Sequence, residues 1–128
     1  MNEKKILAVD DSAMIRKIIS GAAAVLGYGL LEAGNGQEAL VIAERQPGAI
    51  ALVLLDINMP VMSGLEFLRA FRANPDNDTI PVAIVSTESE SSSVFAAIKL
   101  GAQAYILKPF SIEEMERKIV ELIGGPEL

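Results

Sequence analysis

The chain has 128 residues, of which 51% are hydrophobic and only 5% aromatic, so it is long enough for one domain with a core of aliphatic side chains. It contains no cysteine and no histidine, which excludes disulfides, thiolate and imidazole metal ligands, and a histidine nucleophile or base. The formal net charge of −6 argues against nucleic-acid binding by this chain alone, because domains that bind nucleic acid usually carry a basic surface.

The sequence shows no secretory or membrane-spanning segment. Only four consecutive apolar residues, 6–9, precede the first two aspartates, and the longest apolar run, 49–55, is far too short to span a bilayer. We therefore expect a cytoplasmic domain that does not insert into membranes. The ending Gly124-Gly125-Pro126 favours a complete single-domain protein, residues 1–128, over an excised domain.

Five short runs rich in apolar residues predict strands, at residues 6–9, 28–33, 50–55, 82–85 and 104–107. The run 50–55 is too short for a helix and lacks polar alternation, which is typical of a strand buried on both faces of a parallel sheet. The run 28–33 has the weakest pattern of the five.

A segment with apolar residues at helical spacing follows each predicted strand. Asp11 or Ser12 is expected to cap the first helix, which ends at Gly27, and Gly101 is expected to end the fourth. Polar loops are expected at 74–78 and 88–93. Because strands and helices alternate, the sequence predicts an α/β three-layer sandwich with a five-stranded parallel sheet and five helices. The inward helical positions are Ile15, Ile18, Ile19, Ala22, Leu26; Ala39, Leu40, Ala43; Leu65, Leu68, Phe71; Val94, Ala97, Ile98; and Ile112, Met115, Ile119, Leu122, Ile123.

Four of the five predicted strands end in residues capable of chemistry, namely Asp10-Asp11, Asp56, Ser86 and Lys108. Taken singly, each has an ordinary explanation as a helix cap, a turn residue or a solvated side chain. The carboxyl ends of parallel strands share one edge of the sheet, where open α/β sheets bind their ligands. The joint placement therefore favours a functional site built around Asp56.

The residue types at this edge indicate a hard divalent cation and phosphoryl chemistry. Three neighbouring carboxylates repel one another, and oxygen-only ligands select Mg²⁺, with Mn²⁺ as the alternative. Mg²⁺ commonly shares phosphate oxygens, and a carboxylate can attack phosphorus to form an aspartyl phosphate. Lys108 could supply positive charge to the phosphoryl oxygens, and Ser86 could supply a hydrogen bond.

The combination of Asp10-Asp11, residues 56–64, Ser86 and Lys108-Pro109-Phe110 resembles the receiver domain of two-component response regulators, particularly the stand-alone chemotaxis type. The resemblance covers roughly residues 4–124. It implies the flavodoxin-like (CheY-like) fold, with the five parallel strands in the order 2-1-3-4-5.

This resemblance also implies a role for each matching residue. Asp56 would be the phosphoacceptor. Asp11 would bind Mg²⁺ directly, Asp10 chiefly through a water, and Asn58 through its backbone carbonyl. Lys108 would pair with the phosphoryl group and precede a cis peptide bond to Pro109. Ser86 and Tyr105 would be the switch hydroxyl and the switch aromatic residue.

Two positions depart from the family pattern. Thr87 stands where the family usually has alanine or glycine, and its bulk could narrow access to Asp56. The segment Ser91-Ser92-Ser93 lacks the lysine that chemotaxis regulators often carry on their motor-binding face. Asn58 and Glu88, in contrast, match the chemotaxis subgroup.

The function implied is a signalling switch and not a conventional enzyme, although the domain would assist its own phosphorylation and dephosphorylation. A partner histidine kinase would phosphorylate Asp56, the loop from Thr87 would move, and Tyr105 would turn inward. The monomer would then bind an output protein, with the flagellar motor switch as a candidate. Expected surface residues, from the fourth helix to the fifth, are Val94, Tyr105, Ile112 and Lys118.

Other functions remain alternatives. The chain could be a phosphorelay intermediate or the excised receiver of a larger regulator. A haloacid dehalogenase-type phosphatase is a remote alternative, because such enzymes need a second aspartate where this chain has Asn58. An FMN phosphate loop after the first strand is disfavoured, because Asp10-Asp11 would repel phosphate.

Overall fold

The computed structural model describes residues 4–125, apart from the side chain of Glu88, so Pro126 and the switch prediction for the Glu88 side chain lie outside it. Strands and helices alternate along the chain as predicted. The elements are β1 Lys5–Val9, α1 Ala13–Val25, β2 Gly29–Ala33, α2 Gly36–Arg45, β3 Ile50–Asp56, α3 Gly64–Ala73, η1 Pro75–Asn77, β4 Val82–Ser86, η2 Glu88–Glu90, α4 Ser91–Lys99, β5 Ala104–Leu107 and α5 Ile112–Ile123.

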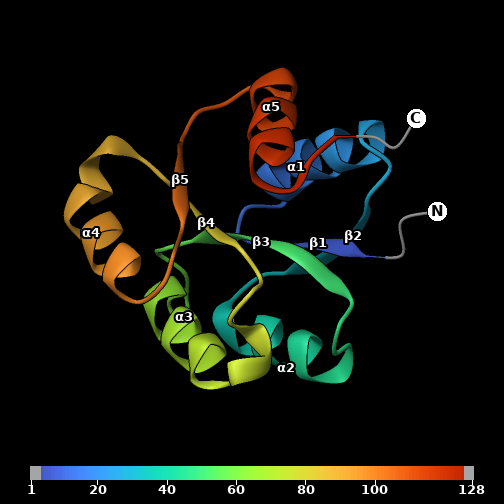
Figure 1. Ribbon diagram of the computed structural model, residues 1–128. Coiled ribbons are helices and arrows are strands. Elements are labelled where there is room, and N and C mark those ends of the chain that lie inside the picture. The colour runs from blue at the N-terminus through green and yellow to red at the C-terminus, as the bar shows by residue number, and fades with distance from the viewer. Residues whose placement is uncertain (1–3, 126–128) are drawn as a thin grey trace.

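The five strands form one parallel sheet in the order β2-β1-β3-β4-β5, which confirms the predicted topology (Figure 1). The register aligns the strand ends that matter for function. Val9 pairs with Leu55, and Asp56 pairs with Val85. The residues that follow β1, β3 and β4 therefore emerge side by side at one edge.

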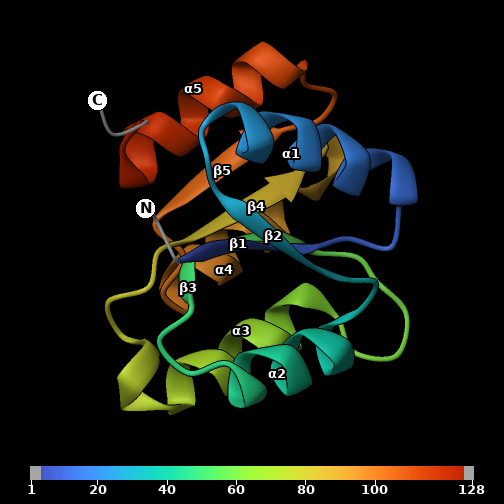
Figure 2. The ribbon, with the colours of Figure 1, turned by 90° about the vertical axis from the view of Figure 1, so that its right-hand side faces the viewer.

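Helices cover both faces of the sheet (Figure 2). Side chains that alternate along β1 and β3 point into two separate cores, as expected for strands buried on both faces. Leu7, Val53 and Leu55 pack with α2, α3 and α4 on one face, where the rings of Phe67 and Phe71 stack at 5.3 Å. On the other face, Ile6, Ala8, Leu52 and Leu54 pack with α1 and α5. The prediction of a three-layer sandwich is confirmed.

Serine and asparagine side chains fix where several helices begin. Ser12 caps α1 by accepting a hydrogen bond from the backbone N of Ile15 at 3.3 Å, which agrees with the predicted cap. Ser63 and Ser111 form reciprocal capping boxes with Glu66 and Glu114 at the starts of α3 and α5. The loops that carry the strand-end residues are therefore anchored where they enter the next helix.

Two predicted loops contain more helical structure than expected. The segment 88–93 consists of η2 followed by the start of α4 at Ser91, so the serine run is helical and not a loop. Residues 75–77, inside the predicted loop 74–78, form η1, whose first residue is a proline with a φ suited to a helical start. In both places short-range capping outweighs the weak helical preference of polar residues.

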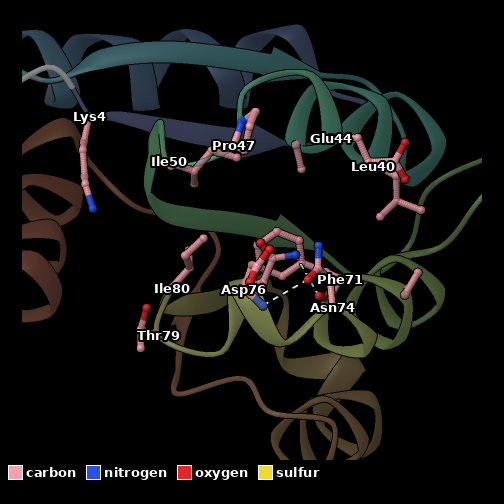
Figure 3. A pocket seen from close by; sticks show the side chains of 14 residues that line it. Lys4, Leu40, Glu44, Pro47, Ile50, Phe71, Asn74, Asp76, Thr79 and Ile80 are labelled. Carbon is pink, nitrogen blue, oxygen red and sulfur yellow. Dashed lines mark hydrogen bonds between the residues drawn. The ribbon is translucent and has the colours of Figure 1, made fainter.

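A pocket of about 280 Å³ lies at the amino-terminal edge of the sheet (Figure 3). Apolar side chains such as Ile50, Phe71 and Ile80 line it together with polar ones such as Glu44 and Asp76. Ile50 begins β3 and Asp56 ends it, so this pocket lies roughly 20 Å from the phosphoacceptor candidate at a rise of about 3.3 Å per residue. Within residues 4–125, none of the helices has the length and apolar character needed to cross a membrane.

Candidate functional site

Three carboxylates meet at the carboxyl edge of the sheet. Asp10 follows β1, Asp11 comes next, and Asp56 ends β3; one oxygen from each lies within 4.8 Å of the others. Asp10 and Asp56 are buried, with 2% and 4% of their surface exposed, whereas Asp11 is exposed. The structure therefore brings together the three acidic residues that the strand ends predicted, with one side of the group open to solvent.

Lys108, which follows β5, reaches across to the two buried carboxylates. Its Nζ lies 3.1 Å from Oδ2 of Asp10 and 3.4 Å from Oδ1 of Asp56. The peptide bond between Lys108 and Pro109 is cis, as the family resemblance implied. The backbone N of Lys108 donates to the carbonyl of Ser86 at 2.7 Å, which ties the end of β5 to the end of β4. The lysine is thus held beside the acceptor candidate from two directions.

Burial and neighbouring charge shift the proton equilibria of this group. Burial, reinforced by the negative charges of Asp10 and Glu90, raises the pKa of Asp56 to about 6, although Lys108 opposes the shift. For Lys108, burial alone would lower the pKa, but its contacts with Asp10 and Asp56 outweigh burial and raise it. At neutral pH the ionised form of Asp56 therefore carries an energetic cost that an added cation would relieve.

The donor set fits a hard divalent cation. Oδ2 of Asp10 is buried and, apart from the ion pair with Lys108, has no hydrogen-bond partner among the described residues. A buried carboxylate oxygen without a hydrogen bond retains the capacity to bind a metal ion or a water on that ion. With two further carboxylates close by and only oxygen ligands at hand, the group fits Mg²⁺, and Asp10, Asp11 and Asp56 are the residues that could hold it.

A fourth acidic residue, Glu90, lies at the rim of the site and was missed from the sequence. Its Oε2 accepts a hydrogen bond from the side-chain amide of Asn58, in the β3–α3 loop. Its Oε1 accepts from the backbone N of Thr87 at 2.8 Å and from the Thr87 hydroxyl at 3.0 Å. The pattern Thr87-x-x-Glu90 is the sequence signature of a capping box, and that signal could have identified Glu90.

The loop between β3 and α3 has a tightly determined shape. The backbone N of Gly64 donates to the carbonyl of Ile57 at 2.8 Å, and a Cβ on Gly64 would lie only 2.1 Å from the carbonyl oxygen of Asp56. Val61 has a φ of 68°, and Met62 N donates to the carbonyl of Pro60 at 2.7 Å, so these residues form a γ-turn of the strained kind. The backbone N of Gly36, at the start of α2, donates to the carbonyl of Met62 at 3.0 Å.

The predicted switch residues Ser86, Thr87 and Tyr105 line a pocket next to strands β4 and β5. Ser86 is buried at the end of β4, Thr87 is exposed, and Tyr105 in β5 is 53% exposed. A largely apolar pocket of about 320 Å³ separates the β4 end from α4 and β5; its lining comprises Ser86, Thr87, Ser91, Val94, Phe95, Ile98, Tyr105 and Leu107. Val94 and Tyr105 therefore share one pocket with Ser86.

The remaining predicted surface residues belong to α5. Ile112 begins the helix, is 40% exposed, and lies next to Gly21 of α1. Lys118 is exposed and pairs with Glu121 at 3.5 Å. Neither lines the pocket at Tyr105, whereas the exposed Phe95, which the sequence prediction did not name, does. Its position at an accessible face of α4 could not be distinguished from a core position by helical spacing alone.

Known proteins share this arrangement. The sequence model of the response regulator receiver domain matches residues 6–120. A chemotaxis protein CheY homolog of Campylobacter jejuni is 35% identical over 121 residues, covering 94% of this chain and 92% of that protein. The structure of the chemotaxis response regulator CheY4 of Vibrio cholerae has a TM-score of 0.85 at 32% identity, with 93% of this chain and 98% of that chain covered.

A longer relative also matches. A probable transcriptional regulator, ycf27 of Porphyridium aerugineum, is 36% identical over 119 residues, or 93% of this chain. The match spans only 48% of that regulator, so the chain corresponds to about half of its length.

Proposed function

The chain belongs to the response regulator receiver domain family, and on that premise we propose that it is a phosphorylation-dependent switch of a two-component system. The observation that carries the proposal is the convergence of Asp10, Asp11 and Asp56 within 4.8 Å, with Lys108 in contact with two of them. A partner histidine kinase is the proposed phosphodonor. The domain does not act as a conventional enzyme, because the group that it transfers ends on its own side chain.

In the proposed reaction, a carboxylate oxygen of Asp56 attacks phosphorus as the bond from phosphorus to the donor's imidazole nitrogen breaks. The electron pair of that bond leaves with the imidazole. Lys108, already 3.4 Å from Asp56, is placed to pair with the phosphoryl oxygens as their charge builds up near the buried carboxylates. A bound Mg²⁺ would supply charge neutralisation for these oxygens. Water then hydrolyses the aspartyl phosphate to the Asp56 carboxylate and inorganic phosphate, so the phosphorylated state is transient.

The output proposed for this switch is a change in the surface formed by α4, β5 and α5. Phosphorylation adds about −1.5 to −2 charge at Asp56, and the hydroxyl of Ser86, at the end of the adjacent strand, would move toward it. The pocket that Ser86 shares with Tyr105 provides the space for the exposed ring to turn inward. Val94, Tyr105, Ile112 and Lys118 are the proposed contact residues, and Thr87 and Glu88 belong to the loop that moves.

The name of the Campylobacter relative supports a chemotaxis-type output protein, with the flagellar motor switch as the proposed partner. We also propose that residues 1–128 form a single domain, which is cytoplasmic and monomeric and binds no nucleic acid. The runner-up is the receiver of a larger regulator or of a phosphorelay, and the half-length match to the ycf27 regulator favours it. A dehalogenase-type phosphatase is disfavoured because Asn58 gives its side-chain amide to Glu90 and has no acid to offer.

The proposal is tested by incubating the protein with Mg²⁺ and acetyl phosphate and locating the label by mass spectrometry. We expect one acid-stable, base-labile phosphoryl group on Asp56, none on the Asp56→Asn variant, and none when EDTA removes the metal. Asp76→Asn, a substitution in the exposed η1 segment, is the matched control and should label like the parent protein. Labelling of Asp56→Asn at the parent's rate would overturn the assignment of the phosphoacceptor.

A further inference from the structure

Glu90 joins the loop that follows Asp56 to the loop that follows Ser86. One carboxylate oxygen accepts from the side chain of Asn58, two residues after Asp56. The other accepts from the backbone N and the hydroxyl of Thr87, one residue after Ser86. A single carboxylate therefore connects the chain segments that directly follow the proposed acceptor and the proposed switch hydroxyl.

We propose that Glu90 is a positioning residue that holds these loops closed over Asp56 in the unphosphorylated protein and must release Asn58 for a phosphodonor to enter. This inference rests on the proposed function and deepens it, because it assigns control of access to a residue outside the carboxylate cluster. The bonds to Asn58 and Thr87 involve an ionised acceptor, which makes each of them stronger than a hydrogen bond between neutral groups. Separating the two loops therefore costs free energy, because these hydrogen bonds must break.

The charge of Glu90 provides a reason for the bridge to open when the switch is on. Glu90 is close enough for its negative charge to act on Asp56. A phosphoryl group there adds about −1.5 to −2 charge and increases this repulsion. Movement of Ser86 toward the phosphoryl group also displaces Thr87, its chain neighbour, which holds the other oxygen of Glu90. Both effects weaken the bridge in the phosphorylated state.

The competing explanation is that Glu90 only caps the η2 turn through Thr87. That local contact needs no partner in the β3–α3 loop, so substitution of Asn58 separates the two explanations. Asn58→Ala removes the cross-loop bond but leaves the contacts between Thr87 and Glu90 intact, and the exposed position of Asn58 makes the variant compatible with folding. Glu90→Ala removes the hydrogen bond to Asn58 and also those to Thr87. Glu90→Gln keeps the side-chain length and can bond to the Asn58 amide once that amide turns over.

The test measures Asp56 labelling against acetyl phosphate concentration at fixed Mg²⁺. A closed state lowers the fraction of competent molecules, so opening it lowers the half-saturating concentration of acetyl phosphate. We expect a decrease of at least about tenfold for Glu90→Ala and for Asn58→Ala, because both variants lose the cross-loop hydrogen bond to a charged group. Glu90→Gln makes only neutral hydrogen bonds and should lie between Glu90→Ala and the parent. Glu44→Ala, which removes an exposed carboxylate at the opposite edge of the sheet (Figure 3), should match the parent.

A parent protein that labels on Asp56, combined with unchanged half-saturation in Asn58→Ala, overturns the bridge but leaves the proposed function standing. A parent that does not label overturns the proposed function instead.

Amide hydrogen exchange at Thr87 tests the bridge directly and does not depend on labelling. We expect faster exchange in Asn58→Ala than in the parent, because the β4–α4 loop loses its anchor. Equal exchange rates would overturn the inference.

Discussion

Replacing Asp56 by asparagine should stabilise the metal-free protein, although it abolishes the proposed acceptor. Burial and the charge of Asp10 raise the pKa of Asp56 from 3.8 to about 6. At about 1.36 kcal/mol per unit, the ionised form costs up to about 3 kcal/mol relative to a neutral side chain at neutral pH. Asparagine has the same shape without the charge, so we expect a gain of about 2 kcal/mol after local adjustment. For a chain of this length, that corresponds to an increase of roughly 7 °C in the unfolding midpoint.

The sign of the pH dependence follows from the direction of the shift. Because the pKa is higher in the folded protein, the cost is absent below pH 3.8, grows as the pH rises, and is complete above about pH 6. Thermal unfolding in EDTA at pH 7.5 and at pH 4 should therefore show a large advantage for Asp56→Asn at the higher pH and a small one at the lower. Asp76→Asn controls for the loss of one charge. An Asp56→Asn variant no more stable than the parent at pH 7.5, or an advantage equally large at pH 4, would refute this reasoning.

Two further predictions concern the turn after Asp56 and the metal. Gly64→Ala should destabilise the fold by at least about 3 kcal/mol in urea titrations, because its Cβ would overlap the carbonyl oxygen of Asp56. The matched control Gly21→Ala, in helix α1 with ordinary contacts around the new Cβ, should gain about 0.5–1 kcal/mol; equal effects of both would contradict the packing argument. Mg²⁺ should stabilise the parent by about 2.7 kcal/mol at a hundredfold excess over its dissociation constant, measured as a shift in thermal midpoint. Asp11→Asn should lose most of this shift, and retention of the full shift would remove Asp11 from the metal site.

The sheet could be predicted from the sequence because its central strands are apolar on both faces. Residues 50–55 and 82–85 admit few other structures, and the register then brings Asp56 and Ser86 to neighbouring positions. The strand ends were therefore sufficient to predict the carboxylate cluster. Lys108 also reaches this edge, where it contacts both Asp10 and Asp56. In this part of the molecule, chain direction and burial determine the geometry.

The rim of the site could not be predicted in the same way. The bond between Asn58 and Glu90 joins residues 32 positions apart in two loops, and no periodic pattern links them. The segment 88–93 reads as a loop from its polar, serine-rich composition, yet α4 begins at Ser91 after a turn stabilised by Thr87 and Glu90. Such details depend on side-chain hydrogen bonds between loops, and these form only after the sheet has placed the loops.

The γ-turn at Val61 lies in the β3–α3 loop, whose shape depends on contacts with α2. A β-branched residue at φ 68° costs about 1–3 kcal/mol and persists only where its surroundings enforce it. Here the enforcing contact is with the start of α2, where Gly36 N binds the carbonyl of Met62 and a Cβ on Gly36 would lie 2.9 Å from that oxygen. The β3–α3 loop is therefore tied to the start of α2 by close backbone contacts. A helix that gives no side chain to the carboxylate cluster thus helps to fix the shape of the loop that follows Asp56.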